Sequence, residues 1–291
     1  RATIAELART HAQLAETEAR APVSVYLLRN TTLEHATPTL ELAGHARGVP
    51  LRYAMCDFDA YRASALRPSP ELQSAPIVVV LLWLEDLPAY DVRSATLDAE
   101  AAFEELWATV DATLANTSAC VMVATFVPPV GVSHASATHD AVEILNGRIR
   151  AAVAGDPRLV VLDLAREVQS LGDRAVDARQ HERTAAPIAE PLIRRIGLRI
   201  ASVAAALSGK SKKVMVVDAD ETLWGGVLGE DGLDGIRLDP RGPGRAHLIF
   251  QRQLRELRER GVLLALASKN DADPVHQRLR EHPTMLLPEE D

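Results

Sequence analysis

The sequence predicts an α/β protein: a doubly wound parallel sheet in the first two-thirds of the chain, followed by a shorter α/β domain. Short apolar runs such as 77–83 have the length and composition of strands buried on both faces. Longer segments with helical periodicity alternate with them, which favours parallel strands joined by right-handed crossovers. The length of 291 residues allows two domains of ordinary size.

Composition is typical of a soluble globular protein, with 47% hydrophobic and 25% charged residues. Aromatic residues make up only 4%, so the core must consist mainly of Ala, Leu and Val. No apolar run reaches the ~18 residues of a membrane span, and no signal-peptide pattern opens the chain. The two cysteines, Cys56 and Cys120, do not make a disulfide framework. We therefore expect a cytoplasmic protein without a membrane partner.

The formal net charge of −8 argues against nucleic acid as a partner. It also disfavours anionic substrates, because a carboxylate and a phosphate ~4 Å apart repel by roughly 4 kcal/mol per charge pair at an effective dielectric of 20. An aspartate that attacks a phosphate therefore needs a divalent cation beside it. Hard oxygen ligands at a solvated site suit Mg²⁺.

The elements of the first domain follow in chain order. Residues 1–20 are predicted to form a helix, because Ile4, Leu7 and Leu14 share one face. The expected strands are 23–28, 49–55, 77–83, 120–126 and 159–164. The expected helices are 36–47, 95–115, 139–153 and 187–207, the last beginning at Pro187.

A polar, basic segment, 208–213, predicts the linker between a domain of residues 1–207 and one of residues 214–291. Its lysines are typical of a solvated linker. The alternative is a patch that, with Arg194, Arg195 and Arg199, contacts an acidic partner.

The second domain opens with an apolar strand, 214–217, that ends in two aspartates, Asp218 and Asp220. The carboxyl end of a buried parallel strand is where open α/β sheets bind ligands. Residues two apart in a strand point the same way, so a bend can bring both carboxylates over one site. One carboxylate can attack phosphorus while the other carries the proton of the leaving oxygen.

Five glycines between Leu223 and Gly235 predict a small hairpin or flap after these aspartates. A helix is expected over 245–260, ended by Gly261, and then a second buried strand over 262–267. That strand ends at Ser268, Lys269 and Asn270.

The pattern Asp218-x-Asp220-x-Thr222 resembles motif I of the haloacid dehalogenase superfamily of phosphotransferases. The resemblance implies that Asp218 is the nucleophile and Asp220 the general acid/base. It also implies that the Asp218 carboxylate and the Asp220 backbone carbonyl bind Mg²⁺, and that Ser268, in the place of motif II, bonds the transferred phosphoryl group. Motifs III and IV are expected beyond Asp291, so the second domain is a truncated Rossmann-like domain of this type.

The longer runs 218–237 and 267–270 are similar to the FkbH-like family, whose haloacid-dehalogenase-type domain follows a domain of the SGNH-hydrolase type. This resemblance implies loading of a glyceryl unit from 1,3-bisphosphoglycerate onto an acyl carrier protein in polyketide biosynthesis. The substrate-binding residues would be Thr222, Trp224, Gly225, Gly226, Lys269 and Asn270. Such proteins can carry a cysteine between the two aspartates, where Ala219 stands here, so Cys56 becomes the candidate for a thioester.

The first domain, over roughly 20–205, resembles the SGNH fold in strand order but lacks its nucleophile motif. Arg29 to Thr32 occupy the nucleophile's place, and Asp177 and His181 are one residue further apart than the late pair of that fold. We expect a docking platform, with Thr31 as the minority candidate for a nucleophile. Asn146 is expected to serve packing or capping. Two alternatives for the whole chain are a Mg²⁺-dependent phosphatase of a small metabolite and a non-catalytic scaffold that binds a carrier.

Overall fold

The protein is described by a computed structural model that covers residues 21–129, 133, 136–184 and 186–287. The chain divides into two compact units between Gly209 and Lys210, inside the basic segment 208–213. The helix expected over 1–20 lies outside the described residues.

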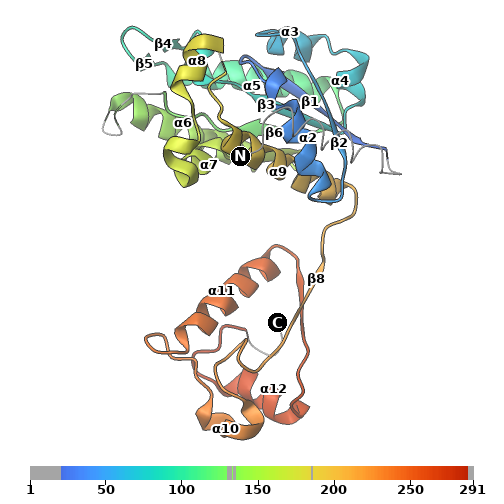
Figure 1. The fold of residues 1–291 in the computed structure, drawn as a ribbon, viewed down its shortest axis with the longest axis vertical. Coiled ribbons are helices and arrows are strands. Elements are labelled where there is room, and N and C mark those ends of the chain that lie inside the picture. Colours follow the sequence, from blue (N-terminus) through green and yellow to red (C-terminus); the bar gives the residue numbers. More distant parts are fainter. Residues whose placement is uncertain (1–20, 130–132, 134–135, 185, 288–291) are drawn as a thin grey trace. The chain divides into compact units, whose positions relative to one another are not determined.

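The N-terminal unit is built on a five-stranded sheet in which every neighbouring pair of strands is parallel (Figure 1). The strand order is β2-β1-β3-β6-β7, so the chain winds outward from β1 in one direction and then, from β3, in the other. This confirms the α/β class and the parallel sheet. The strands are β1 (Val23–Arg29), β2 (Leu51–Met55), β3 (Ile77–Leu81), β6 (Cys120–Ala124) and β7 (Leu159–Leu162).

Helices cover both faces of this sheet, and each face has its own apolar core. Alternate residues of β1 point to opposite sides: Val25 and Leu27 join one core, whereas Tyr26 and Leu28 join the other. The first core is closed by α2 (Thr37–His45), α7 (Leu164–Leu171) and α9 (Glu190–Leu207). The second is closed by α3 (Tyr61–Leu66), α4 (Pro70–Ser74), α5 (Ala99–Asn116) and α6 (Ala137–Val153).

Shorter elements fill the connections. They are η1 (Glu34–Ala36), η2 (Leu84–Asp86), β4 (Tyr90–Asp91), β5 (Thr96–Leu97), η3 (Gly172–Arg174) and α8 (Ala178–Thr184). Two predicted helix starts are wrong. α5 begins at Ala99 because the Asp98 side chain caps it. α9 begins at Glu190 with Pro191 in its first turn, while Pro187 lies before the helix.

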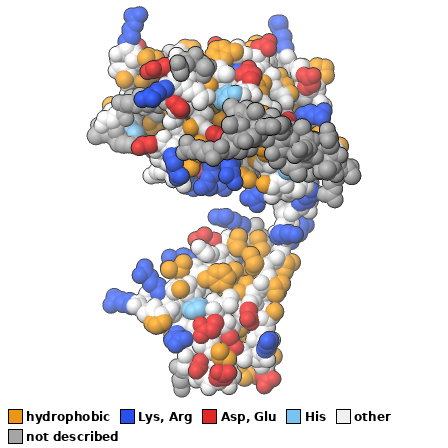
Figure 2. All heavy atoms as spheres, in the orientation of Figure 1, with side chains coloured by type: hydrophobic (Ala, Val, Ile, Leu, Met, Phe, Trp, Pro, Cys, Tyr) orange, Lys and Arg blue, Asp and Glu red, His pale blue; other side chains and the backbone are white. Residues whose placement is uncertain are grey.

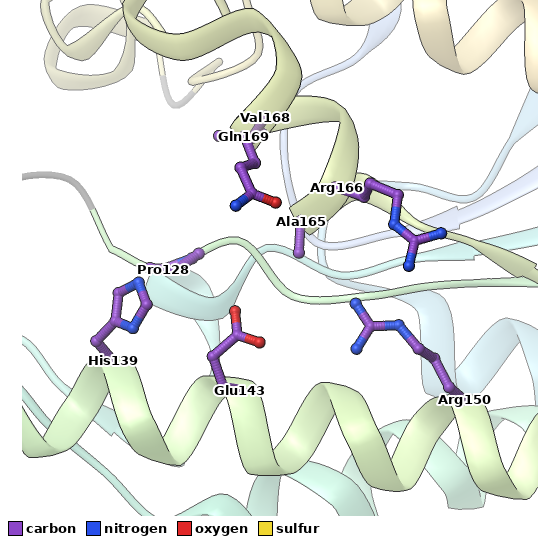
Figure 3. Close-up of a pocket in the computed structure, with 8 residues that line it drawn as sticks. All are labelled: Pro128, His139, Glu143, Arg150, Ala165, Arg166, Val168 and Gln169. Carbon is purple, nitrogen blue, oxygen red and sulfur yellow. The ribbon is translucent and has the colours of Figure 1, made fainter. Parts of the chain in front are cut away.

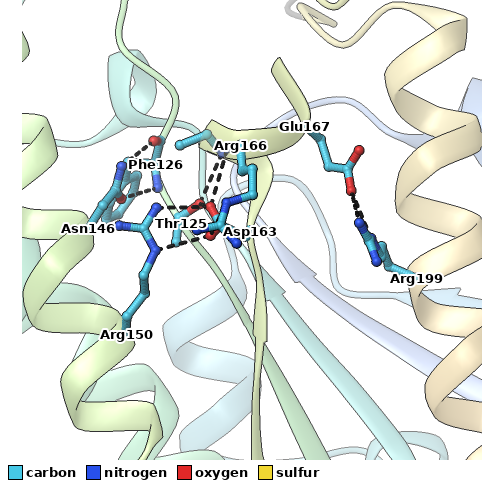
Figure 4. Close-up of polar contacts among 9 residues, drawn as sticks. Thr125, Phe126, Asn146, Arg150, Asp163, Arg166, Glu167 and Arg199 are labelled. Carbon is cyan, nitrogen blue, oxygen red and sulfur yellow. Dashed lines mark hydrogen bonds and ion pairs between the residues drawn. The ribbon is translucent and has the colours of Figure 1, made fainter. Parts of the chain in front are cut away.

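Two buried asparagines tie loops together at the carboxyl ends of the strands. The Asn30 amide donates to the carbonyl of Trp83 at 3.0 Å and accepts from its N–H at 2.6 Å. Asn146 makes the same pair of bonds with the backbone of Phe126, both at 2.8 Å (Figure 4). Asn146 is therefore a packing group, as predicted, and its amide is not free to act as an oxyanion donor.

Asp163 joins β7, α6 and α7 in one polar cluster (Figure 4). Its carboxylate accepts two hydrogen bonds from Arg150, each at 3.0 Å, and one from the backbone N–H of Arg166. Burial by itself would raise the pKa of Asp163, but these bonds outweigh it and hold the pKa below its usual value.

We expect this arrangement to make stability depend on pH. Because the folded-state pKa of Asp163 is depressed, its contribution is present above the unfolded-state pKa of about 3.9 and is lost as the pH falls through the folded value. Asp163→Asn should therefore lower the free energy of unfolding by about 1–3 kcal/mol at pH 7, and by progressively less in acid. Urea unfolding followed by circular dichroism between pH 7 and pH 3 measures the difference; a difference that does not vary with pH would contradict the prediction.

The C-terminal unit has a two-stranded parallel sheet of β8 (Val214–Val217) and β9 (Leu263–Leu266). Three helices accompany it: α10 (Leu228–Gly235), α11 (Arg245–Glu259) and α12 (Ala272–Glu281). A small apolar core gathers around Trp224, Leu238 and Leu254. Gly261 has a φ of +88° and follows Arg260, the C-cap of α11, as expected of a residue that ends a helix.

The prediction that β8 and β9 are buried is wrong. Val214, Val216 and Leu263 are all more than half exposed, and Met215 and Leu266 are also exposed. Figure 2 shows hydrophobic side chains gathered on the part of the C-terminal unit where β8 runs. The physical reason is that no further strand or helix of the described residues covers these side chains.

The expected flap after the aspartates also takes a different form. Residues 228–235 form α10, whose backbone is kinked at Gly232 with a φ of +68°. The only hairpin-like feature of the segment is the antiparallel bridge between Gly225 and Arg237. Among the described residues, no helix is long and apolar enough to cross a membrane.

Candidate active site at the ends of β8 and β9

The pairing of β8 with β9 brings the two predicted motifs to one edge of the sheet. Val217 lies opposite Leu266, and the backbone N–H of Ala267 donates to the carbonyl of Val217 at 2.9 Å. Asp218 and Ser268 therefore follow directly after the ends of paired strands. The resemblance to motifs I and II implied that these residues lie at one site, and the carboxyl ends of parallel strands are where open α/β sheets bind ligands.

Asp218 is exposed to solvent and makes few contacts of its own. Its Oδ1 accepts one hydrogen bond, at 2.8 Å, from the backbone N–H of Ala219. Ala219 is completely buried, and it anchors the residues that follow. The Asp218 carboxylate can thus meet a ligand from solvent.

Asp220 has a different environment, because three donors hold its carboxylate. Oδ1 accepts from the indole Nε1 of Trp224 at 3.0 Å and from the backbone N–H of Leu228 at 3.1 Å. Oδ2 accepts from Nδ2 of Asn270 at 2.8 Å. Burial acts to raise the pKa of Asp220, but the bonds from Leu228, Asn270 and Trp224 together lower it.

The loop after Asp220 is a tight turn around the carbonyl of Ala219. This carbonyl accepts backbone N–H groups from Thr222, Leu223 and Trp224, at 3.3, 2.8 and 3.4 Å. Glu221 has a φ of +51°, a conformation that costs free energy for a residue other than glycine. Its side chain accepts from the N–H of Gly226 at 2.9 Å, which helps to hold the turn.

Two side chains of α11 brace this turn from behind. Gln251 is completely buried, and its Nε2 donates to the carbonyl of Leu223 at 2.7 Å while its Oε1 accepts from the N–H of Leu286 at 2.9 Å. His247 Nδ1 lies 2.9 Å from the carbonyl of Thr222. The sequence reasoning missed both residues. A polar glutamine among the apolar positions of α11 was the available signal for Gln251.

The structure corrects part of the predicted substrate-binding set. Trp224 is 0% exposed, and Gly225 and Gly226 are buried, so these three residues are not positioned to touch a substrate. Trp224 instead contacts Asp220. Thr222 is half-buried and Lys269 is exposed, which leaves both accessible. Asn270 contacts Asp220 and Ser268.

Cys56 is poorly suited to the predicted thioester. It is 3% exposed, its sulfur accepts the N–H of Arg29 at 3.3 Å, and its thiol donates to the Arg29 carbonyl. Burial raises the pKa of the thiol, so the nucleophilic thiolate is disfavoured. The strand-end position that suggested Cys56 is correct, but the packing of β1 against β2 closes it off from solvent.

The N-terminal unit does not expose the threonine that was considered as a nucleophile at the end of β1. Thr31 is 0% exposed, which argues against the minority interpretation of it as a nucleophile. His181 lies with its Nε2 3.6 Å from the carboxylate of Glu85, while the Asp177 carboxylate accepts from the backbone N–H of Gln180. The late Asp–His pair suggested by the sequence is therefore not paired through its side chains in any contact of the described residues.

An open pocket of about 490 Å³ lies between α6 and α7 of this unit (Figure 3). Glu143 and His139 project from α6, and Gln169 and Arg166 from α7. Arg150, on the same wall as Glu143, is already engaged by Asp163. Among the described residues, the lining contains no Ser, Thr or Cys to act as a nucleophile, so the ends of β8 and β9 remain the stronger candidate.

The donor set around Asp218 fits Mg²⁺ in a limited way. An exposed carboxylate is a hard oxygen ligand, and Mg²⁺ usually binds one or two carboxylates together with water and substrate phosphate. The Asp220 side chain is occupied by its three donors, so its backbone carbonyl is the group that the resemblance leaves for the metal. No cluster of three or more His, Cys, Asp or Glu side chains suited to a metal exists within the described ranges.

Comparison with known proteins identifies a shared fold. No family model matches the sequence, and no curated protein matches it significantly. The structure is similar to the N-terminal part of a Bacteroides fragilis protein that contains a phosphatase domain and was crystallised with Mg. The TM-score is 0.79 at 20% identity, over 99% of this chain and 79% of that chain. A GDSL-like lipase from Bacteroides thetaiotaomicron gives a TM-score of 0.42 at 16% identity, over 70% of this chain and 100% of the lipase chain.

Proposed function

We propose that this chain is a Mg²⁺-dependent phosphotransferase of the haloacid dehalogenase type that acts on a small phosphorylated substrate. The observation that carries the proposal is the contrast between the two aspartates after β8. Asp218 is exposed and lightly bonded, as a nucleophile should be, whereas Asp220 is held in one orientation by three donors. The solved structure that shares this fold contains a phosphatase domain and Mg, which supports the same assignment.

In the proposed reaction, an oxygen of Asp218 forms a bond to phosphorus as the bond to the substrate's leaving oxygen breaks. Asp220, which accepts hydrogen bonds as a carboxylate in the structure, first takes up a proton from solvent and then supplies it to that oxygen. Water then attacks the phosphoaspartate, Asp220 accepts its proton, and phosphate leaves. Ser268 donates a hydrogen bond to the phosphoryl group from the neighbouring strand end. Bound Mg²⁺, held by the Asp218 carboxylate and the Asp220 backbone carbonyl, would offset the charge repulsion between carboxylate and phosphate.

The finer proposal is that the substrate derives from 1,3-bisphosphoglycerate and that a glyceryl unit reaches an acyl carrier protein, as in polyketide biosynthesis. The resemblance of 218–237 and 267–270 to the FkbH-like family supports it. Since Cys56 is buried and Ala219 stands between the aspartates, the carrier's own thiol is the better acyl acceptor. Its sulfur attacks the acyl carbon, the phosphate at that carbon leaves, and Asp218 removes the second phosphate.

Part of the basic surface suggested for a carrier is already paired. Arg199 donates to Glu167 at 2.7 Å, and Arg195 lies 3.9 Å from the same carboxylate (Figure 4 shows the Glu167–Arg199 pair). Arg194 is exposed on the same helix, α9. Docking of an acidic carrier would therefore depend more on Arg194 than on Arg195 or Arg199.

One experiment tests both levels of the proposal. The protein is incubated with 1,3-bisphosphoglycerate, with or without a carrier protein, in Mg²⁺ or in EDTA. We expect phosphate release that requires Mg²⁺, and, with carrier, a mass gain of one glyceryl group on the carrier by mass spectrometry. Phosphate release without any change in carrier mass would support a phosphatase and contradict the proposed glyceryl transfer. If neither this substrate nor other small phosphate esters release phosphate in a Mg²⁺-dependent way, both the phosphatase and the transferase proposals are wrong.

A further inference from the structure

Asn270 links the two halves of the candidate active site through a single amide group. Its Nδ2 donates to Oδ2 of Asp220 at 2.8 Å and lies 3.2 Å from Oγ of Ser268. Its backbone N–H also donates to that Ser268 oxygen at 3.2 Å. Asp220 follows β8 and Ser268 follows β9, so this residue connects the ends of both strands.

The amide oxygen of Asn270 lies next to the first turn of α10. A Cβ built on Gly229, in the first turn of α10, would lie 3.5 Å from Oδ1 of Asn270. The same helix supplies the N–H of Leu228 to Asp220. Asn270 is half-buried between these groups, whereas its neighbours Lys269 and Asp271 are exposed.

The contacts of Asp220 show why this amide matters. The two donors on Oδ1, from Trp224 and Leu228, both come from the segment that follows Asp220 along the chain. The Asn270 amide is the donor on Oδ2, and it comes from the other strand, 50 residues away in sequence. Without it, Oδ2 of Asp220 loses this donor, and the residues after β9 lose their side-chain hydrogen bond to the Asp220 carboxylate, although the backbone ladder of β8 and β9 remains.

We infer that Asn270 is a positioning residue, which fastens the Asp220 carboxylate to the Ser268 end of the sheet, and not a substrate-binding residue. The expected effect on kcat rests on the function proposed above, because it requires Asp220 to act in the reaction. The expected effect on the orientation of the Asp220 carboxylate does not depend on that function. A group that only orients a catalytic carboxylate affects kcat, whereas a group that contacts the substrate equally in ground and transition states affects KM.

The test compares three variants of the full chain. Asn270→Asp keeps the shape of the side chain, replaces the donor by an acceptor and places a like charge against Asp220. Asn270→Ala removes the amide without adding charge. Asp271→Asn is the matched control, because Asp271 is exposed and makes no side-chain hydrogen bond to the start of α12.

Two readouts are taken. Steady-state phosphate release gives kcat and KM, and the indole N–H resonance of Trp224 in metal-free protein reports on the Asp220 carboxylate, which accepts that proton. The resonance is identified by its loss in Trp224→Phe. We expect Asn270→Asp and Asn270→Ala to lower kcat about 10²-fold while KM changes by less than about threefold. We expect both variants to move the indole resonance, and the control to change neither quantity.

Several results would overturn the inference. An increase in KM at unchanged kcat would make Asn270 a substrate contact. An indole resonance that stays in place in both variants would show that Asn270 does not hold Asp220. If Asn270→Asp does not fold, judged by circular dichroism, Asn270→Ala decides. If the unaltered protein releases no phosphate, the proposed function fails by itself, and the indole resonance alone decides whether Asn270 positions Asp220.

Discussion

Asp218→Asn is expected to lower phosphate release by about 10⁴-fold or more, because the variant has no anionic oxygen to attack phosphorus. The substitution keeps the size of the side chain, and the amide oxygen can still accept the N–H of Ala219 as the carboxylate does at 2.8 Å. Asp218 is exposed and belongs to no packed core. The free energy of unfolding should therefore change by less than about 0.5 kcal/mol.

The measurement is single-turnover phosphate release in Mg²⁺, with denaturant unfolding as the check on folding. Asp273→Asn is the control, because it removes one exposed carboxylate, in the first turn of α12, from the same unit. The control should retain full activity. If Asp218→Asn keeps more than a tenth of the normal rate while folded, Asp218 is not the nucleophile and the proposed reaction is wrong.

Trp224→Ala is expected to destabilise the C-terminal unit by about 3–5 kcal/mol, the usual cost of truncating a fully buried tryptophan. Trp224 is 0% exposed and is among the largest completely buried side chains of the described residues. Its loss leaves a cavity in a core of few members, and it removes one donor from Asp220. Trp224→Phe keeps most of the apolar volume, so it should cost about 1–2 kcal/mol.

Hydrogen–deuterium exchange of peptides from 214–287 measures this effect within the C-terminal unit, since the two units need not unfold together. Trp107 provides the comparison: it is half-buried in the N-terminal unit and stacks on Phe103 with ring centroids 5.4 Å apart. Trp107→Ala should cost less than Trp224→Ala and leave exchange in 214–287 unchanged. An equal or smaller cost for Trp224→Ala would mean that its side chain does not hold this core together.

The candidate site could be predicted in outline because its signals are local. An apolar strand followed by Asp218 and Asp220, and a second strand followed by Ser268, are patterns of neighbouring residues. The resemblance to motifs I and II of the haloacid dehalogenase superfamily then placed them in one site. The contacts of Trp224 and Asn270 with Asp220 were not predicted, because side-chain direction depends on the fold of the turn. The tight turn around the Ala219 carbonyl sends the Trp224 indole inward to Asp220.

Burial was the least predictable property. Strands of similar apolar composition differ in exposure: β3 is completely buried between two layers of helices, whereas β8 and β9 are largely exposed. Composition cannot separate these cases, since burial depends on which elements pack over a strand. The burial of Cys56 could not be predicted either, because its neighbours in sequence do not reveal that its thiol bonds to the backbone of Arg29.

By itself, the sequence determined the α/β class, most of the strands, the four longest helices of the described residues (α5, α6, α9 and α11), and the position of two aspartates and a serine after strands. These follow from periodicity and from short motifs, in which the relevant residues are a few positions apart. The tertiary structure alone decided which carboxylate is open to solvent and which is held by donors. That difference arises because the turn after Asp220 directs two donors, from Trp224 and Leu228, onto its carboxylate, and because the pairing of β8 with β9 brings in a third from Asn270, 50 residues later in the chain.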